Sequence, residues 1–294
     1  MRRATAMDSP VLQPALKILP RRLARRAIPT GRVLAPIGFH AVAAVLALAT
    51  CASVARAAAL ATDPLVAHGH EVYIHEGCIH CHSQYVRPRV PADVERWGPA
   101  SDWAKLAADQ PPLPGNRRNG PDLANVANRR SAEWNRLHLQ KPRAVSPGSR
   151  MPSYAHLFRR GGDESDGEAL VAYLASLGAD TIPQRLAQTS AWRPDRSAPP
   201  TDAAHARRIF AQLCTPCHGP AGHGDGPLAA RLSVRPPDWP AQGWRRVPPD
   251  ADVELALARI VKFGLPGSPM AGHETLPDTD VLGLARLVRS WQKH

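Results

Sequence analysis

The sequence is poor in aromatic residues, with four Phe, four Tyr and seven Trp among 294 residues. A chain of this length predicts one large or two small domains, and each domain needs an apolar core. So few aromatic side chains leave little material for those cores. We therefore expect something other than aromatic side chains to fill part of them.

Acidic residues are also scarce, with 25 Asp or Glu against 37 Lys or Arg and a formal net charge of +12. A charge of this size is a common sign of a nucleic-acid-binding protein. Residues 1–57, however, carry nine Lys or Arg and one Asp, which leaves 28 basic and 24 acidic residues for the rest. The remainder is thus close to balanced, and this excludes a basic nucleic-acid-binding body.

The N-terminal segment has the charge order of an export signal. An arginine-rich stretch precedes residues 33–55, which contain no Asp, Glu, Lys or Arg, and Ala55-Arg56-Ala57 then offers a signal-peptidase site. We expect residues 1–57 to be a cleaved signal peptide. Residues 33–55 are also long enough for an uncleaved anchor in the inner membrane, since a span needs about 20 residues. A lipoprotein site at Cys51 is disfavoured by Thr50. All three alternatives predict a periplasmic body.

Four of the five cysteines stand in two Cys-x-x-Cys-His motifs. On one helical turn, thiols at positions i and i+3 face the same side, so each can form a thioether with one vinyl group of a porphyrin. The following His can then project its imidazole at the iron. Two copies behind an export signal predict two covalently attached haem c groups, on Cys78, Cys81, His82, Cys214, Cys217 and His218.

Two other uses of such cysteines are weaker. A zinc half-site could use Cys-x-x-Cys, and a redox-active dithiol would look similar, but a dithiol has no need of His82 or His218. The motifs also use every cysteine after residue 57, so no structural disulfide can form between other residues there.

The only methionines after residue 57 are Met151 and Met270, and each follows one motif and precedes a terminal helix of its half. Their matching positions predict that they are the sixth iron ligands, beside the proximal His82 and His218. His/Met ligation suits an iron that passes electrons. Histidines are the competing ligands, and the candidates are His138, His156, His223 and His273.

Two further kinds of residue are candidates around the haems. A backbone carbonyl in Gly120–Leu123 or Arg235–Asp238 could accept the Nδ1 proton of the proximal histidine, although both segments could equally be ordinary proline turns. Arginines could pair with haem propionates, and Arg87, Arg89 and Arg96 are examples, although a solvated role suits each of them equally.

Apolar spacing predicts an all-α fold with long ordered loops, and the haem motif in each half makes this two tandem cytochrome c domains. Helical i, i+3, i+4, i+7 patterns occupy 206–213, 170–177 and 281–288, and no segment alternates with period two. We expect a left-handed cap at Gly178. The predicted domains are residues 58–180 (the first half) and 201–294 (the second half), joined by a proline-containing linker at 181–200.

Several strings in the first half resemble the mono-haem subunit (subunit II) of cbb3-type cytochrome c oxidases. The resemblance covers about residues 66–160. It includes Cys78-Ile79-His80-Cys81-His82-Ser83-Gln84-Tyr85-Val86-Arg87-Pro88, Asn119-Gly120-Pro121-Asp122-Leu123 and Met151-Pro152-Ser153-Tyr154. The second half resembles a class I cytochrome c through Cys214 to Gly219 and Gly222 to Pro227. The familiar subunit has one haem and a transmembrane helix, so this chain departs from it by a second haem domain and an ambiguous leader.

The resemblance implies electron transfer toward a haem-copper oxidase catalytic subunit, with a cytochrome c or a quinol-oxidising complex as the donor. We expect no catalytic residues in this chain, because the sequence supplies no copper ligands and no oxygen-reducing site. Two alternatives belong to other classes. One is the electron-accepting subunit of a periplasmic dehydrogenase, and the other is a di-haem peroxidase, which would need an open sixth position on one iron.

Overall fold

The computed structural model describes residues 63–159, 165–244, 246–247 and 251–292. The chain divides into two compact units at residues 51 and 52, and only the second unit contains described residues. The predicted signal peptide or anchor, with Cys51, lies outside the described residues. Within the described part, no helix is both long and apolar enough to cross a membrane.

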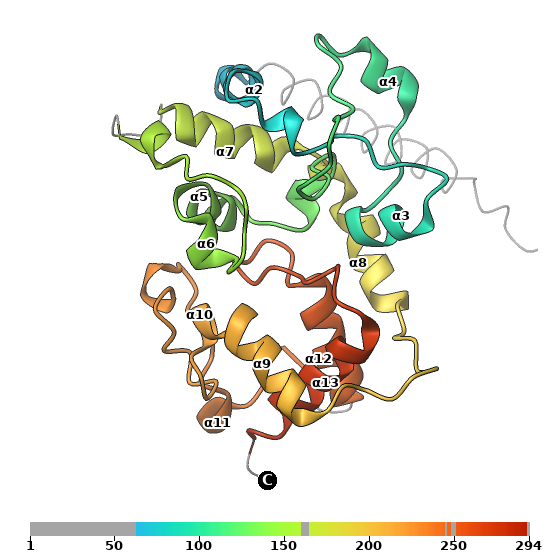
Figure 1. Cartoon of the computed structure of the whole chain (residues 1–294), viewed down its shortest axis with the longest axis vertical. Helices are drawn as coiled ribbons and strands as arrows, with labels where there is room; N and C mark the ends of the chain where they lie inside the picture. The colour runs from blue at the N-terminus through green and yellow to red at the C-terminus, as the bar shows by residue number, and fades with distance from the viewer. Residues whose placement is uncertain (1–62, 160–164, 245, 248–250, 293–294) are drawn as a thin grey trace, which may run out of the picture. The chain divides into compact units, whose positions relative to one another are not determined.

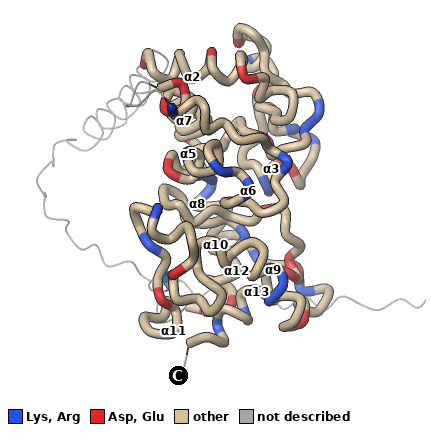
Figure 2. Tube along the Cα trace, turned by 60° about the vertical axis from the view of Figure 1, so that its left-hand side comes forward, with Lys and Arg blue, Asp and Glu red and all other residues tan. Residues whose placement is uncertain are grey.

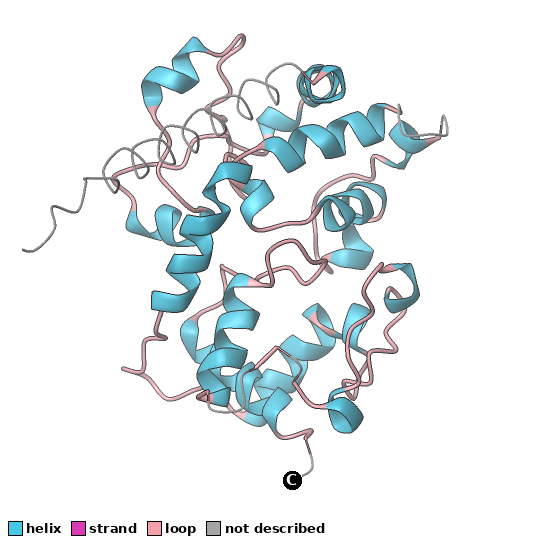
Figure 3. Ribbon diagram, turned by 180° about the vertical axis from the view of Figure 1, so that it is seen from behind, coloured by secondary structure: helices cyan, strands magenta, loops and turns pink. Residues whose placement is uncertain are grey.

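The fold is helical, as predicted, and loops of many lengths connect the helices (Figure 3). In the described residues the only β-type pairing is an isolated antiparallel bridge between Gly264 and Ala271. Up to residue 191 the elements are α2 (Pro64–His75), η1 (Cys78–His80), α3 (Pro91–Trp97), α4 (Trp103–Ala108), η2 (Val126–Asn128), α5 (Ala132–Gln140), α6 (Pro142–Val145), η3 (Ala155–Phe158), α7 (Asp166–Ser176), η4 (Ala179–Thr181) and α8 (Ile182–Ala191). From residue 203 they are α9 (Ala203–Leu213), α10 (Thr215–His218), η5 (Ala229–Arg231), α11 (Trp239–Gln242), α12 (Val253–Phe263) and α13 (Asp278–Arg289).

The three helices predicted from apolar spacing are confirmed as α7, α9 and α13. Side-chain caps define where two of them begin, because Ser165 accepts a hydrogen bond from the Glu168 amide and Asp202 accepts one from the His205 amide. The predicted left-handed residue after α7 is also confirmed, since Gly178 has a φ of 72°.

In the first half, α7 packs against α2 and α5 (Figure 1). Gly69 lies where α2 crosses α7, and a Cβ at this position would overlap the Ala169 carbonyl. The close crossing therefore requires glycine. Around it lies an apolar cluster that includes Tyr73, Leu139 and Leu170.

The second half has its own apolar cluster, built where α13 packs against α9 and α12 (Figure 1). Phe210, Leu257 and Leu284 are buried in it. Trp291 packs edge-on against Phe210 at 4.7 Å between ring centroids. Each predicted half thus has a separate core.

The predicted linker contains a packed helix, α8, that apolar spacing did not reveal. Its most buried residue is Arg185, with 1% exposure, whereas Leu186 is 50% exposed. Because the buried position, 185, holds an arginine and not an apolar residue, the sequence shows no amphipathic pattern for this helix. Trp192, directly after α8, stacks edge-on against Phe263 of α12 at 5.4 Å.

Candidate haem centres

The two Cys-x-x-Cys-His motifs close the same single turn of backbone. In the first motif the Cys81 and His82 amides donate to the Cys78 carbonyl at 3.1 and 2.9 Å. In the second, the Cys217 and His218 amides donate to the Cys214 carbonyl at the same two distances, 3.1 and 2.9 Å. The two thiols and the imidazole therefore have matching backbone frames in both halves.

None of the four cysteines in the described residues forms a disulfide. Burial raises the pKa of the Cys78 thiol and that of the Cys214 thiol to about 12. A redox-active Cys-x-x-Cys works through a thiolate whose pKa is lowered. The thiol environments are therefore unlike those of a redox-active dithiol.

The proximal side of the first centre is held by a backbone carbonyl. His82 Nδ1 lies 2.8 Å from the Pro121 carbonyl oxygen, so the imidazole donates from Nδ1 and its Nε2 is left to bind a metal. A Cβ on Gly120 would overlap the His82 ring, so only glycine fits there. Burial lowers the pKa of His82, and the bond to Pro121 partly opposes this. The interaction predicted for Gly120–Leu123 is confirmed.

Asp122 fixes the turn that carries this carbonyl. Its buried carboxylate accepts hydrogen bonds from Ser83 Oγ at 2.5 Å and from the Tyr85 and Ala124 amides at 2.9 Å each. Ser83 and Tyr85 directly follow the first motif. The same carboxylate therefore ties the motif to the loop beneath His82.

The proximal side of the second centre is built differently. His218 Nδ1 is buried without a hydrogen-bond partner, so the carbonyl expected from Arg235–Asp238 does not serve it. Instead the ring stacks on Trp239, with 4.3 Å between centroids and an 18° interplanar angle. Burial, followed by the charge of His273, lowers the pKa of His218 to about 4. A neutral imidazole is the form that binds a metal.

The two methionines lie in matching turns. Ser149 Oγ accepts from the Met151 amide at 3.2 Å, and Ser268 Oγ accepts from the Met270 amide at 3.2 Å. Both methionine residues are half-buried. The Leu265 amide also donates to the Met270 carbonyl at 2.9 Å, which closes the second loop against the end of α12.

Each methionine loop lies beside its own motif. Met151, Tyr154 and Cys78 pack against the same apolar cluster. Burial, with Cys78 as the next contribution, raises the pKa of Tyr154 to about 12. In the second half, His273 is close enough to His218 to shift its pKa electrostatically. The residue three positions after each methionine therefore lies near the matching motif.

The competing histidines fall into two groups. His156 and His223 are half-exposed and pair with carboxylates, at 3.6 Å from Glu76 and 3.1 Å from Asp238. His138 and His273 have a pKa lowered to about 4, chiefly by burial. Only the second group has the buried imidazole that a competing iron ligand requires. No group of three His, Cys, Asp or Glu in the described residues could hold a metal ion.

One arginine proposed for a haem propionate is already paired within the chain. Arg87 donates from Nε and Nη2 to the two oxygens of Asp93 at 2.6 and 2.9 Å. Sequence reasoning missed Arg129, which is 3% exposed, has an unpartnered Nε and is near enough to His82 to influence its pKa. Arg129 lies in a polar loop with no periodic signal, so its burial could not be anticipated.

The residues present fit a haem group in both halves. In the first half, His138 Nδ1 is a buried polar atom without a partner, and His138 lies within electrostatic reach of His82, as expected where a polar cofactor edge belongs. Met151 also lines a cavity of about 250 Å³ beside Lys141 and Arg143. These features supply thiols, a neutral imidazole, apolar walls and cationic edges.

Two small helical cores, each with a Cys-x-x-Cys-His turn and a downstream methionine loop, define a c-type cytochrome. The chain belongs to the family described as cytochrome C oxidase, mono-heme subunit/FixO, whose model matches residues 41–190. A second family model, described as cytochrome C oxidase, cbb3-type, subunit III, matches residues 201–288. The resemblance stated from the sequence is therefore confirmed for both halves, and the protein has the electron-transfer role of a cytochrome.

No curated protein matches the chain. Among solved structures, a chain of the Kuenenia stuttgartiensis reducing HAO-like protein complex is similar at 19% identity and a TM-score of 0.30. The match covers 77% of this chain and 96% of that one.

Proposed function

We propose that the protein is a di-haem c-type cytochrome that carries electrons to a cbb3-type haem-copper oxidase. Cys78 and Cys81 bind one haem c covalently, and Cys214 and Cys217 bind the other. When bound, each haem supplies an iron that takes up and releases one electron. The oxidase chemistry belongs to a partner subunit, and the donor is a cytochrome c or a quinol-oxidising complex.

The chain's own residues hold each centre ready for this exchange. His82 keeps its Nδ1 proton on the Pro121 carbonyl, at 2.8 Å, so Nε2 is the free ligand atom. His218 is held by stacking on Trp239, at 4.3 Å. Met151 and Met270 supply the sixth ligands from turns that their serines close. Ligand frames fixed before the electron arrives keep the structural change on transfer small.

One observation carries the proposal, namely that the two centres repeat the same motif turn and the same methionine turn. In each motif the backbone amide of the His donates a hydrogen bond to the carbonyl of the first Cys at 2.9 Å. In each half a methionine amide also donates to a serine hydroxyl at 3.2 Å. A single chance motif would not reproduce both parts in both halves. The match of each half to a cbb3 oxidase family model supports the choice of partner.

The proposed domains are residues 58–180 and 201–294, with 181–200 between them and a leader at 1–57. We place the mature protein in the periplasm, either cleaved after Ala57 or anchored to the inner membrane by residues 33–55. Lys or Arg and Asp or Glu are interspersed along the described chain (Figure 2), as suits a body of nearly balanced charge.

Expression with a tag in a host that matures c-type cytochromes tests the proposal. Purification from membranes should give two haems per chain by haem staining and spectroscopic quantification, together with an oxidase catalytic subunit. Cys78→Ser with Cys81→Ser, and separately Cys214→Ser with Cys217→Ser, should each leave one haem.

The di-haem assignment fails if the chain carries fewer than two haems. The partner assignment fails if the chain copurifies with a dehydrogenase, or if it never supports oxygen consumption with an oxidase. Peroxide turnover by the native protein would favour the peroxidase alternative.

A further inference from the structure

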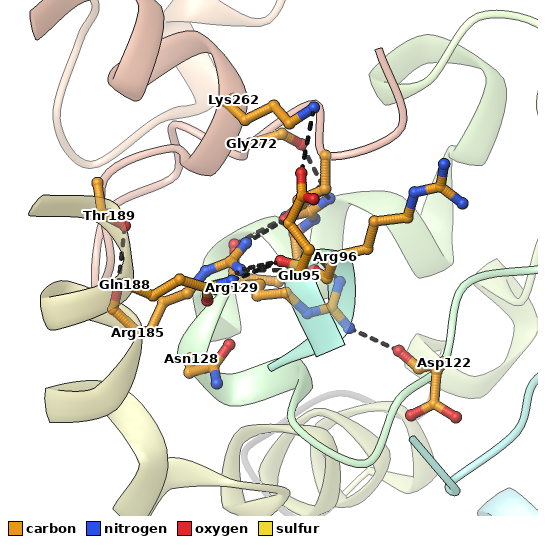
Figure 4. A network of polar contacts seen from close by, with 12 residues as sticks. Glu95, Arg96, Asp122, Asn128, Arg129, Arg185, Gln188, Thr189, Lys262 and Gly272 are labelled. Carbon is orange, nitrogen blue, oxygen red and sulfur yellow. Dashed lines mark hydrogen bonds and ion pairs between the residues drawn. The ribbon is translucent and has the colours of Figure 1, made fainter. Parts of the chain in front are cut away.

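A single carboxylate of the second half is buried among arginines from elsewhere in the chain. Glu274 is 3% exposed and receives two parallel hydrogen bonds from Arg130, Nη1 to Oε1 and Nη2 to Oε2, both at 2.9 Å. Arg185 of α8 donates to the same carboxylate at 3.0 Å, and Arg129 lies 4.0 Å away. Figure 4 shows the surrounding network. A buried, forked pair has a fixed geometry that exposed ion pairs lack.

Arg130 also holds the backbone of the methionine loop. Its Nη2 donates to the Gly272 carbonyl at 3.0 Å, two residues after Met270. A Cβ on Gly272 would lie 2.5 Å from the Phe263 carbonyl carbon, so the loop is packed tightly onto the end of α12. A shift of Arg130 or Glu274 would therefore move the segment that carries the proposed ligand of the second haem.

Arg130 also contacts helix α5 of the first half, close to the first haem centre. Its guanidinium lies 5.0 Å from the centroid of the Trp134 ring, and Trp134 stacks on His138 at 4.5 Å with an interplanar angle of 10°. His138 is near enough to His82 to feel its charge. Contacts through Arg130 thus run from His138 in the first half to the loop of Met270 in the second.

Charge effects agree with this placement. Arg130 lowers the pKa of His138 and also that of His273, one in each half, after the larger effect of burial. His273 in turn acts on His218. Among the described residues Arg130 is the cation that influences buried histidines beside both proximal ligands.

We propose that Arg130 and Glu274 are positioning residues that hold the two haem centres at one separation and thereby set the rate of electron exchange between them. The inference rests on the proposed function, since it needs two haems in one chain. The exchange moves one electron from the reduced to the oxidised centre, with no bond made or broken. The pair acts through helix α5 and through the loop that carries Met270, and among the described residues no hydrogen bond or ion pair joins it to either motif.

The test uses the full chain with both haems. Glu274→Gln keeps the shape of the side chain and removes its charge, and Arg130→Lys keeps the charge and loses the fork. The matched control is Glu133→Gln, because Glu133 makes an exposed contact between the halves, with the Ser233 amide and hydroxyl at 2.6 and 2.7 Å. Two readouts are taken, namely the distance distribution between the two ferric centres by pulsed EPR and the rate of internal electron equilibration after flash reduction.

The wild type and Glu133→Gln should give one narrow distance and the same rate. Glu274→Gln should broaden the distribution and slow equilibration severalfold, because electron exchange becomes slower as the two centres move apart. A variant with two haems, a narrow distance and the wild-type rate would overturn the inference. If Glu274→Gln does not fold, Arg130→Lys decides by the same two readouts. Fewer than two haems in the wild type would instead overturn the proposed function.

Discussion

His82 and Pro121 lie 39 residues apart in the chain and are joined by a 2.8 Å contact between Nδ1 and the carbonyl oxygen. The contact fixes the imidazole tautomer and its orientation at once, because the ring can donate only from the nitrogen that faces the carbonyl. Glycine at position 120 lets the backbone approach the ring. The loop beneath His82 is therefore part of the centre.

Gly120→Ala should disable the first centre and leave the second intact. The new Cβ would overlap the His82 ring, and overpacking of this kind costs about 1–3 kcal/mol. We expect the haem signal of the first centre to weaken or change spin state, as read by absorption and EPR spectra. Gly283→Ala is the control, because a Cβ at that position would crowd Thr201 in the second half instead of the His82 ring. Unchanged spectra in Gly120→Ala would contradict the close approach.

Met151→Ala and Met270→Ala should each convert one low-spin haem into a high-spin haem, because each removes a proposed sixth ligand. The measurement is the spin-state fraction by EPR and absorption in each single variant. His138→Ala and His273→Ala are the matched controls, since these are the buried competing imidazoles. If the histidine variants change spin state while the methionine variants do not, the ligand assignment is wrong.

Asp93→Asn should destabilise the loop that leads to Gly120. The Asp93 carboxylate is 5% exposed, is bonded to Arg87 at 2.6 and 2.9 Å and lies 3.4 Å from Arg118. Loss of hydrogen bonds to a charged partner should lower the unfolding free energy by about 1–3 kcal/mol in denaturant titrations. Glu71→Gln, whose side chain is 80% exposed, should change it little. Equal stability of the two variants would show that the Asp93 contacts contribute nothing.

Glu274 should make stability depend on pH in the acid range. Burial alone would raise its pKa, but the charge and hydrogen bonds of Arg130, with the charges of Arg129 and Arg185, outweigh burial and lower the pKa below 4.5. A carboxyl with a lowered folded pKa stabilises the fold above its unfolded pKa, and this contribution is lost as pH falls through the folded value.

The unfolding free energy of the wild type should therefore exceed that of Glu274→Gln by about 3 kcal/mol near neutral pH. This difference should disappear as the pH falls below 4.5. The difference between the two chains is measured by denaturant unfolding at each pH. The comparison is repeated with His273→Ala in both chains, because the charge of Glu274 also acts on the pKa of His273. A gap that stays constant down to the acid limit would contradict the prediction.

Local patterns in the sequence predicted the parts of the structure that local rules control. The spacing of Leu170, Tyr173 and Leu174 on one helical face predicted α7, and the Gly-Pro sequence after the first motif predicted the carbonyl beneath His82. The same reasoning was wrong for Arg235–Asp238, because the tryptophan that follows stacks on His218 instead.

Contacts between distant polar segments had no such signal. Glu274 meets Arg130 across 144 residues and Arg185 across 89. Charged residues in loops are usually solvated, so the sequence offered no reason to bury these. Helix α8 was missed for the same reason, since its buried position holds an arginine.

Helix α8 also affects how electron exchange between the two proposed centres depends on protein concentration. Two separate cytochromes must find each other by diffusion, so their encounters become rarer on dilution. A short tether makes the second partner available at an effective concentration on the order of millimolar. Because α8 joins the halves directly and packs against α12, electron exchange between the two proposed haems would be a first-order event, independent of how many copies the cell makes.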